Sequence, residues 1–295
     1  MQALAIDIGG TKILAGLVAA DGTIDGLVEV PTPAREGSGA ILDAVLAAAR
    51  AARAATSARP VACGVGTAGV VAPDGSIASA TDLLRGWAGT PLRAALAAEL
   101  GLEVRVLNDV HATGLCEALL GAARGHGSAL VVAVGTGIGG AIVRNGMVEQ
   151  GAHGIAGAIG HLPAPLRQGR ICSCGVLDHV EAYASGPALE AEYRRRTGRP
   201  RGLRAIAAAG EAEARAVIAE GAAALGAVIG GANNLVDTSV IVIGGGVAGI
   251  GEAFLAPLRA GIAAEALGAT RAVPVVPARF GARACLVGAG LLALA

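Results

Sequence analysis

One local pattern occurs twice in this chain of 295 residues: an apolar strand runs into a turn of glycine and threonine, and a second strand follows. In the first copy Ala5 to Ile8 form the strand and Gly9 to Lys12 the turn. In the second, about 130 residues later, Leu130 to Val134 are followed by Gly135 to Gly140. Because one hydrophobic and turn pattern specifies one local structure, the repetition predicts an internal duplication of an α/β unit.

Both turns have the composition of a phosphate-binding loop. Glycine lacks a side chain and tolerates positive φ, so backbone N–H groups can approach a phosphate closely. The first loop also follows an acid, Asp7, placed at a strand end where it can anchor the shell of a Mg²⁺ ion. The pair predicts a two-lobed enzyme that handles ATP. The expected nucleotide contacts are Asp7, Gly9, Gly10, Thr11 and Lys12 from the first copy and Gly135, Thr136, Gly137 and Gly139 from the second.

A third glycine run, Gly244, Gly245 and Gly246, follows the apolar segment 240–243. A run of this kind also serves as a tight turn between a strand and a helix, and alone it is a weak signal. Together with the two phosphate loops, it predicts a floor for the adenine and ribose of the nucleotide.

Asn108 and Asp109 stand between an apolar strand and a helical pattern. Asp109 could simply cap the helix that follows, since aspartate is favoured at that position. Phosphoryl transfer to a hydroxyl, however, needs a carboxylate that accepts or orients the hydroxyl proton. With two phosphate loops in the same chain, we favour Asp109 as a general base.

His161, Cys172, Cys174 and His179 lie within 19 positions of one another. Two thiols and two imidazoles can complete the tetrahedral shell of a zinc ion. Four protein ligands leave no open coordination position, so such a site would be structural. The alternative is a surface loop with two free cysteines and ordinary histidines.

Composition excludes several partners. The 23 Lys and Arg residues balance the 23 Asp and Glu residues, which gives no electrostatic attraction to nucleic acid or to an anionic membrane. The chain opens directly on an apolar strand, so we expect no signal peptide. Five cysteines without a disulfide spacing indicate a reducing compartment, and we expect a cytoplasmic protein.

Alternating strand and helix patterns predict α/β sheets covered by helices. The expected strands cover residues 3–8, 13–19, 24–30, 61–66, 104–107, 130–134, 140–144 and 240–243. The expected helices cover residues 38–56, 91–99, 109–120, 185–196, 205–236 and 285–292. Residues 147–180 have no core-forming pattern and are expected to form an irregular insertion.

The motifs together resemble those of the ROK family of sugar kinases and repressors. Asp7 to Lys12 resembles the first phosphate motif of that family, Gly135 to Gly140 the second, and Gly244 to Gly246 the adenosine motif. Asn108 and Asp109 match its sugar-binding Asn and catalytic Asp. Cys172 to Glu181 is similar to its zinc signature, C-x-C-G-x-x-G-C-x-E. The resemblance extends over essentially the whole chain.

The resemblance implies the actin-like ATPase fold (also called ribonuclease H-like), with duplicated α/β domains and a cleft between them. It implies a small N-terminal lobe, residues 1–112, onto which a C-terminal helix at about 284–295 packs back. It implies a larger lobe, residues 113–283, that carries the zinc-motif insertion at about 147–181. It further implies Mg²⁺ with ATP, a structural Zn²⁺ and a homodimer.

By the same resemblance, Asp109 takes the proton from the 6-hydroxyl of a sugar as that oxygen attacks the γ-phosphorus of ATP. The expected substrate contacts are Asn108, His161, Glu181, Asp82 and Gly69. Repressor members carry an N-terminal helix-turn-helix, and we expect none here because the first strand begins at Ala3.

Three departures from the family pattern bear on function. The third cysteine of the zinc signature is His179 here, and the glycine before it is Asp178. The family's E-x-G-H motif, whose Glu binds sugar hydroxyls in glucokinase-like members, begins with Ala158. A missing acceptor at a polar sugar site costs on the order of 1–3 kcal/mol.

Members that phosphorylate N-acetylmannosamine resemble this chain in lacking that Glu, in the opening motif and in Glu181 to Gly186. We therefore favour phosphorylation of an N-acylhexosamine, N-acetylmannosamine in particular, over a hexose such as glucose. A glucokinase remains the alternative within the class. A sugar-binding protein with little or no kinase activity is the alternative from another class, and a transcriptional regulator without its own DNA-binding domain has little support.

Overall fold

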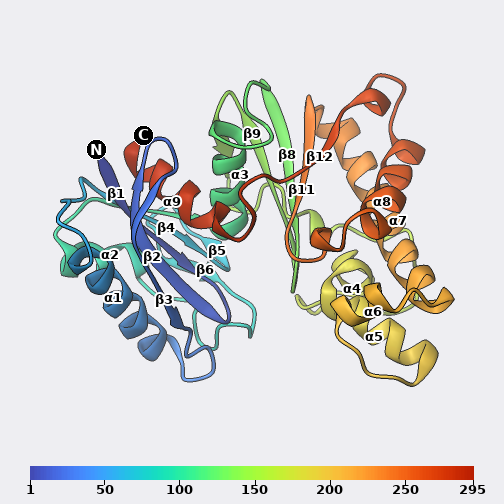
Figure 1. The fold of residues 1–295 in the computed structure, drawn as a ribbon, viewed down its shortest axis with the longest axis horizontal. Helices are drawn as coiled ribbons and strands as arrows, with labels where there is room; N and C mark the ends of the chain where they lie inside the picture. The colour runs from blue at the N-terminus through green and yellow to red at the C-terminus, as the bar shows by residue number, and fades with distance from the viewer. The chain divides into compact units, whose positions relative to one another are not determined.

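The computed structural model describes residues 1–295, which form two compact α/β units. Unit 1 consists of Met1–Gly125, Gly146–Ala156 and Phe280–Ala295, and unit 2 consists of His126–Asn145 and Gly157–Arg279. In Figure 1 the first strands of unit 1 are blue, and the strands of unit 2 are green and orange. Each unit builds its own hydrophobic core around a sheet.

The sheet of unit 1 has the strand order β3-β2-β1-β4-β7. β1 pairs antiparallel with β2, and β2 with β3, whereas β1, β4 and β7 run parallel. The strands are β1 (Gln2–Ile8), β2 (Lys12–Ala19), β3 (Ile24–Pro31), β4 (Cys63–Thr67) and β7 (Val104–Asn108), and β5 (Val70–Val71) and β6 (Ile77–Ser79) form a separate small hairpin. The helices are α1 (Ser38–Ala54), α2 (Leu92–Leu100), α3 (Asp109–Leu119) and α9 (Ala284–Leu294).

Alternation along β1 divides the core of unit 1 between the two faces of its sheet. Leu4, Ile6 and Ile8 pack in one cluster with residues of α1 and α2. Ala5, one position out of phase, packs in another cluster with residues of α3 and α9. Asp7 has the same parity as Ala5, so β1 directs its carboxylate to the side of the sheet that α3 and α9 cover (Figure 1).

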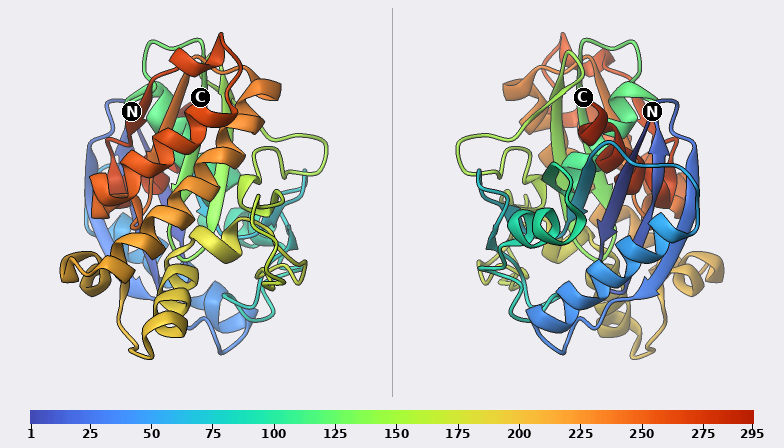
Figure 2. Two further views of the ribbon diagram at one scale, coloured as in Figure 1. Left: turned by 90° about the vertical axis from the view of Figure 1, so that its right-hand side faces the viewer. Right: turned by 90° about the vertical axis from the view of Figure 1, so that its left-hand side faces the viewer.

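The second sheet has the strand order β10-β9-β8-β11-β12. Unit 2 contains its strands β8 (Ser128–Val134), β9 (Ile138–Arg144), β11 (Val240–Gly244) and β12 (Val275–Pro277), whereas β10 (Met147–Glu149) lies in the segment 146–156 that groups with unit 1. The helices of unit 2 are α4 (Glu181–Ala184), α5 (Gly186–Thr197), α6 (Leu203–Ala209), α7 (Ala212–Val236) and α8 (Glu252–Glu265). The left view of Figure 2 shows α7 and α8 side by side across the strands. Short 3-10 helices cover Ile159–His161, Ala248–Ile250, Thr270–Ala272 and Gly281–Arg283.

The two sheets repeat one topology. In each, the first two strands form an antiparallel hairpin around a glycine-threonine loop, and the third strand lies beyond the second. The fourth strand, β4 or β11, pairs parallel with the first on its other side, and β7 or β12 extends the sheet in the same direction. The predicted duplication is therefore confirmed at the level of strand order and direction.

Most expected elements are present within a few residues of their predicted bounds, but residues 205–236 do not form one helix. The segment breaks at Gly210, whose φ of +62° ends α6 and permits α7 to begin at Ala212. α8 and β12 were not expected. Pro257 lies inside α8 and obscures the helical pattern, while β12 has only three residues and ends in a proline.

α7 is the one helix long and apolar enough, by length and composition, to cross a membrane. However, 56% of the most apolar stretch of α7 is buried inside the protein. Its glycines bring α8 very close: a Cβ added at Gly226 would lie 2.1 Å from the Leu258 carbonyl oxygen. One added at Gly230 would lie 2.5 Å from that of Ile262. The composition of α7 thus reflects tight packing of two helices in the core of unit 2.

The compact units and the lobes expected from the sequence have different bounds. α3 groups with unit 1 because it packs on α9 and because its buried Glu117 accepts a hydrogen bond from Phe280 N, at 2.9 Å. Residues 146–156 also group with unit 1, since His111 of α3 contacts the Ala156 carbonyl oxygen at 2.8 Å. The helix expected at about 284–295 is α9, and it packs on β1, β4 and α3.

Candidate active site

The parallel strands of unit 1 place three polar residues at one edge of the sheet. In the registers of β1 with β4 and of β4 with β7, Asp7 lies opposite Gly66, and Thr67 lies opposite Asn108. The carboxyl ends of parallel strands are where α/β sheets bind ligands. The sequence-predicted Asp7, Asn108 and Asp109 therefore meet at the functional edge of this sheet.

Asp109 is the first residue of α3, and Asn108, not Asp109, is the helix cap. The Asn108 side-chain oxygen accepts hydrogen bonds from Val110 N and His111 N, at 2.9 and 3.3 Å. Helix capping, the alternative explanation for an aspartate at position 109, therefore does not apply. Burial raises the pKa of its carboxyl, and the hydrogen bond from Val110 N opposes that rise. A raised pKa moves a carboxylate toward the range in which it can accept a proton efficiently.

Asp7 is the second perturbed acid of this edge. Desolvation by burial raises its pKa from 3.8 to about 6. A hydrogen bond from the Cys285 thiol and the charge of Lys12 lower the pKa, whereas the charge of Asp109 raises it. Two partly buried carboxylates that repel one another form a natural site for a cation, because a bound cation offsets both the repulsion and the desolvation. Asp7 fits the donor chemistry of Mg²⁺.

The first glycine-threonine loop is a tight turn between β1, which contains Asp7, and β2. Gly9 N donates to the Lys12 carbonyl oxygen at 3.0 Å, and the Thr32 hydroxyl donates to the Gly9 carbonyl oxygen at 2.7 Å. A Cβ at Gly10 would lie 2.7 Å from a methyl carbon of Leu83. The loop that holds Asp82 and Leu83 therefore lies against this glycine-threonine loop, and a side chain at Gly10 would have to displace the Leu83 methyl group.

Asn108 also orders the segment expected to contact sugar. Its side-chain amide donates to the Gly69 carbonyl oxygen at 3.0 Å. Gly69 has a φ of +100°, and a Cβ there would lie 2.6 Å from the Ser79 carbonyl oxygen, so the position requires glycine. Trp87 is fully buried and donates from its indole nitrogen to Thr67 Oγ1 at 3.1 Å. Trp87 thus supports the edge of the sheet from inside the core, as packing alone predicts.

In unit 2 the second loop and the third glycine run lie against each other. Val247 N donates to the Val134 carbonyl oxygen at 2.9 Å. A Cβ at Gly245, whose φ is +89°, would lie 2.3 Å from that same oxygen. Added Cβ atoms at Gly135 and Gly246 meet nothing within 4 Å, so the backbone there faces open space. The structure thus unites two predicted nucleotide motifs at the carboxyl ends of β8 and β11.

The segment 157–161 packs on β9 through glycines. A Cβ at Gly160 would lie 2.1 Å from the Ile138 carbonyl oxygen, and one at Gly140 would lie 2.4 Å from that of Gly157. This contact fixes Ala158 and His161 beside the strand that begins directly after the second loop. Ala158 is half-buried, with φ −66° and ψ 57°. The backbone at this position, where the family motif has a Glu, is therefore free of the positive φ that would restrict its side chain.

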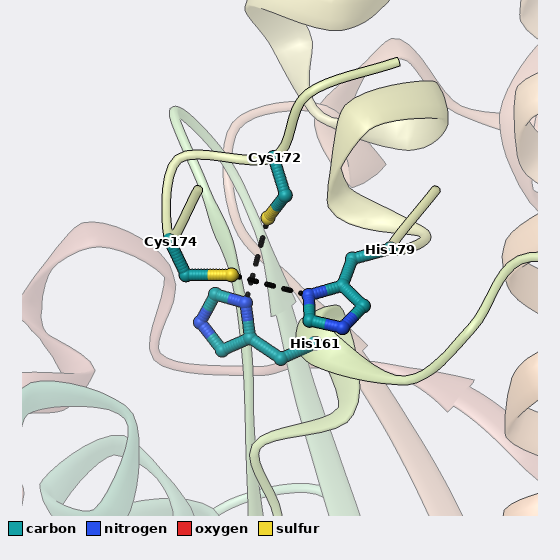
Figure 3. A group of neighbouring side chains, drawn as sticks. All are labelled: His161, Cys172, Cys174 and His179. Atoms are coloured by element: carbon teal, nitrogen blue, oxygen red, sulfur yellow. Dashed lines mark hydrogen bonds between the residues drawn. The ribbon is translucent and has the colours of Figure 1, made fainter. Parts of the chain in front are cut away.

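His161, Cys172, Cys174 and His179 converge as predicted, and Figure 3 shows their sulfur and nitrogen atoms directed toward a common centre. The four ligand atoms lie within 4.8 Å of one another. Cys172 Sγ is 3.5 Å from His161 Nδ1, and Cys174 Sγ is 3.2 Å from His179 Nδ1. A tetrahedral zinc shell needs ligand separations of roughly 3.3–3.8 Å. The cluster fits zinc after a small closure, and His179 stands where the family has its third cysteine.

Asp178 keeps the turn that glycine makes in the family pattern. Its φ is +59°, in the left-handed region, where aspartate is tolerated better than most residues. Its carboxylate accepts hydrogen bonds from Gln168 N and Arg170 N, at 3.2 and 3.0 Å, and from the Tyr183 hydroxyl. These hydrogen bonds hold the pKa of Asp178 below its usual value, the Tyr183 hydroxyl contributing most. The Asp178 side chain therefore stabilises the loop, residues 168–178, that contains Cys172 and Cys174.

Sequence reasoning missed two residues of these sites. Cys285 is one: its thiol contacts the Asp7 carboxylate, and a Cβ at Gly66 would lie 2.3 Å from its sulfur. Ile138 was not expected to take part, yet its N–H donates to Glu181 Oε2 at 2.8 Å. No local pattern could have revealed either contact, because both join segments far apart in the chain.

Comparison with known proteins identifies relatives along the full length. The model described as ROK family matches residues 3–295. A glucokinase of Streptomyces coelicolor is 32% identical over 312 residues, which cover 98% of this chain and 96% of that protein. An N-acetylmannosamine kinase of Shigella boydii is 34% identical over 296 residues, which cover 99% and 98%.

Solved structures of the same kind superpose closely. A ROK hexokinase from Thermus thermophilus has a TM-score of 0.85 and 35% identity, and covers 100% of this chain and 98% of its own. A ROK family glucokinase from Streptomyces griseus, in complex with glucose and AMPPNP, has a TM-score of 0.87 and 31% identity, with 100% and 99% covered.

The duplicated sheets, each with a glycine-threonine loop between its first two strands, define the actin-like ATPase fold, and the relatives define an ATP-dependent sugar kinase. The chain belongs to the ROK family. Both the fold class and the family expected from the sequence are thereby confirmed.

Proposed function

We propose that this kinase transfers the γ-phosphoryl group of ATP to the 6-hydroxyl of an N-acylhexosamine, with Asp109 as the general base. The observation that supports the role most directly is the position of Asp109. Its partly buried carboxylate, whose pKa desolvation raises, lies at the start of α3, on the sheet edge that also carries Asp7, and Asn108 caps α3. Asp109 removes the proton as the sugar oxygen attacks phosphorus, while ADP leaves.

The remaining groups divide between nucleotide and sugar. Asp7 would hold Mg²⁺, which neutralises phosphate charge during transfer. Backbone N–H groups of the two glycine-threonine loops would bind phosphates, and Gly244 to Gly246 would support the adenosine. Asn108, Gly69, Asp82, His161 and Glu181 remain the proposed sugar contacts. His161 directs Nδ1 to the metal cluster and so keeps Nε2 for another partner.

The choice of N-acetylmannosamine as substrate rests on Ala158. A relative named N-acetylmannosamine kinase and one named glucokinase are similarly distant from this chain, so identity alone does not separate the two sugars. Without a carboxylate at position 158, the site lacks an acceptor for one glucose hydroxyl, which disfavours glucose. Glucokinase activity is the second candidate, supported by the glucose-bound neighbour from Streptomyces griseus.

The test of this function is identification of the product. Purified protein is incubated with Mg-ATP and N-acetylmannosamine, and phosphorus-proton correlation NMR locates the ester. A 6-phosphate is expected. Sugar binding by calorimetry without any phosphate ester would instead favour a sugar-binding protein that lacks kinase activity.

Introducing the missing carboxylate should redirect specificity. Ala158→Glu is expected to raise kcat/KM for glucose relative to N-acetylmannosamine by about tenfold, since one added hydrogen bond to a charged group stabilises by about 1.5 kcal/mol. Steady-state kinetics on both sugars measure the ratio. Ala158→Gln is the matched control: it adds the same bulk without charge and should change the ratio less. An unchanged ratio in both variants would remove Ala158 as a determinant of specificity.

We also propose that His161, Cys172, Cys174 and His179 hold a structural Zn²⁺ ion. Burial raises the pKa of Cys172 to about 11, because the charged thiolate is poorly solvated there. A bound metal ion would stabilise the thiolate, since a coordinated thiol is deprotonated. With no bound cation, a thiol of that pKa stays protonated at neutral pH.

Metal analysis should find one zinc per chain, and Cys174→Ala should abolish it. The melting temperature of Cys174→Ala is expected to fall by about 5–10 °C, which corresponds to roughly 2–3 kcal/mol in a domain of this size. His153→Ala serves as the control, because His153 is exposed and lies outside the cluster. Native protein that binds no zinc, with an unaffected melting temperature in Cys174→Ala, would refute the site.

A cytoplasmic location and a homodimer complete the proposal. A kinase that consumes ATP must work where ATP is supplied, which supports the location. The dimer rests on the family alone.

A further inference from the structure

Residues 168–178, here called the metal loop, form a small hairpin that is closed at its base by Arg170 and Asp178. Arg170 N donates to Asp178 Oδ1 at 3.0 Å, and Asp178 N donates to the Arg170 carbonyl oxygen at 2.8 Å. Three of the four metal-cluster residues lie on this loop or directly after it (Figure 3). The backbone and the side chain of one residue, Asp178, therefore both hold the base of the loop.

The carboxylate of Asp178 also joins the metal loop to α4. It accepts a hydrogen bond from the Tyr183 hydroxyl and one from Gln168 N, the latter at 3.2 Å. Gln168 N is shared with the Tyr183 hydroxyl oxygen, at 2.9 Å. Asp178 is 8% exposed and Tyr183 is 2% exposed, so these contacts form away from water. Hydrogen bonds to a carboxylate are about twice as strong as those between neutral groups.

Arg170 extends the same network to α5. Its guanidinium lies over the ring of Tyr183, 4.5 Å from the ring centre, and donates to Glu192 Oε2 at 2.7 Å. Glu192 is buried, and it also accepts hydrogen bonds from Arg195 and Arg196 of its own helix, at 2.8 and 2.6 Å. The metal loop is thus attached by side chains to two helices of unit 2, and none of these contacts uses a group of the metal cluster.

From these contacts we propose that Asp178 is a positioning residue that keeps the metal loop folded when no metal is bound, so that a metal ion enters a preorganised site. The part of the inference that concerns metal affinity rests on the proposed Zn²⁺ site. A glycine at position 178, as in the family motif, would permit the same turn but would lack the carboxylate. The metal ion would then have to supply the order of the loop.

Tryptic cleavage between Arg167 and Gln168 tests this directly. Arg167 is exposed, and Gln168 N is one of the groups that Asp178 holds, so cleavage there requires the loop to open. In native protein stripped of metal by a chelator, the cleavage rate should stay within about twofold of that of the zinc-loaded protein. In metal-free Asp178→Gly it should be about tenfold higher, because the hydrogen bonds to a charged group are lost. Added zinc should slow this cleavage again.

Asp237→Gly is the matched control for Asp178→Gly. Asp237 also has a left-handed φ, +53°, but it is exposed at the end of α7. Metal-free Asp237→Gly should therefore be cleaved between residues 167 and 168 at the native rate.

Tyr183→Phe is a second variant, which tests the network should Asp178→Gly fail to fold. It keeps the buried ring and removes the hydroxyl that contacts Asp178, so cleavage of the metal-free protein should be about threefold faster. Tyr193→Phe is its control: Tyr193 is also buried, but its hydroxyl donates to Glu211 at 2.9 Å. Tyr193→Phe should leave the cleavage rate unchanged.

Zinc affinity provides an independent readout. In competition with a chromophoric chelator, Asp178→Gly should bind zinc about tenfold more weakly than the native protein. The reason is that part of the binding free energy is then used to order the loop. Asp237→Gly should bind zinc like the native protein.

Two results would overturn the inference. In the first, metal-free native protein is cleaved as fast as metal-free Asp178→Gly, which would mean that the metal alone holds the loop. In the second, metal-free Asp178→Gly and Tyr183→Phe both resist cleavage like the native protein. Native protein that binds no zinc would refute the proposed zinc site alone, because the cleavage rates of the metal-free proteins would still decide the role of Asp178.

Discussion

Asp109→Asn should lower kcat by about 10²–10⁴-fold while the dissociation constants of sugar and Mg-ATP change little. Asparagine has nearly the shape of aspartate, and its side-chain oxygen can still accept the hydrogen bond from Val110 N that Asp109 accepts at 2.9 Å. It cannot take a proton from the sugar hydroxyl. The loss should therefore fall on the chemical step, which single-turnover kinetics isolates from binding.

Asp43→Asn provides the comparison for Asp109→Asn, since it makes the same chemical change at an exposed position of α1. Its kcat should equal that of the native enzyme. If Asp109→Asn retained native kcat, the base would have to be another group, and the proposed mechanism would fail.

Asp7→Asn is expected to stabilise the fold and to impair the enzyme. The folded protein keeps a proton on Asp7 up to pH about 6, whereas the unfolded chain loses it near the ordinary value of 3.8. The folded state thus binds more protons between these values, and the free energy of unfolding falls as pH rises from about 4 to 6. The loss has an upper limit of about 3 kcal/mol, because one pKa unit corresponds to about 1.4 kcal/mol.

Asparagine has no proton to lose, so Asp7→Asn should melt at a higher temperature than the native protein at pH 8 and at a similar temperature at pH 4. In Asp7→Asn the melting temperature should still depend on pH, though less steeply, because burial also raises the pKa of Asp109. Activity should fall by about 10²-fold, because Mg²⁺ loses its carboxylate and the phosphate charge is less well neutralised.

Calorimetric melting from pH 4 to 8, with steady-state kinetics over a range of Mg²⁺ concentrations, measures both effects. Added Mg-ATP should reduce the difference in melting temperature between Asp7→Asn and the native protein. The reason is that Mg²⁺ is expected to bind the carboxylate of Asp7 better than the amide that replaces it. A melting temperature for Asp7→Asn below that of the native protein at pH 8 would contradict the assigned burial cost.

The repeated pattern made the fold predictable. Strand, glycine-threonine loop and strand specify a hairpin, and two copies of it led to two sheets of one order. The two glycine-threonine loops, Asp109 and the four clustered His and Cys residues could be selected as candidates because each group is compact in sequence or matches a family motif. The predicted bounds of helices were less accurate where a single residue ends a helix. Gly210 is an example, because its left-handed conformation separates α6 from α7.

What could not be predicted depends on contacts between distant segments. The contact of Glu181 with Ile138 joins residues 43 positions apart in the sequence, and that of Cys285 with Asp7 joins the two ends of the chain. The raised pKa values of Asp7 and Asp109 arise from burial, which becomes known only when α3 and α9 cover their side of the sheet. Asp178 shows the same limit: the sequence marks it as a departure from glycine, but only the fold shows its carboxylate accepting hydrogen bonds inside the metal loop.

The most direct test of the central claim is ADP release from Mg-ATP by the purified protein with each of five sugars: glucose, mannose, fructose, N-acetylmannosamine and N-acetylglucosamine. We expect the highest kcat/KM with N-acetylmannosamine, and in Asp109→Asn we expect turnover of that sugar to fall by about 10²–10⁴-fold. Folded, zinc-loaded protein that turns over none of these sugars would contradict the proposed function, and a clear preference for glucose would contradict the role assigned to Ala158.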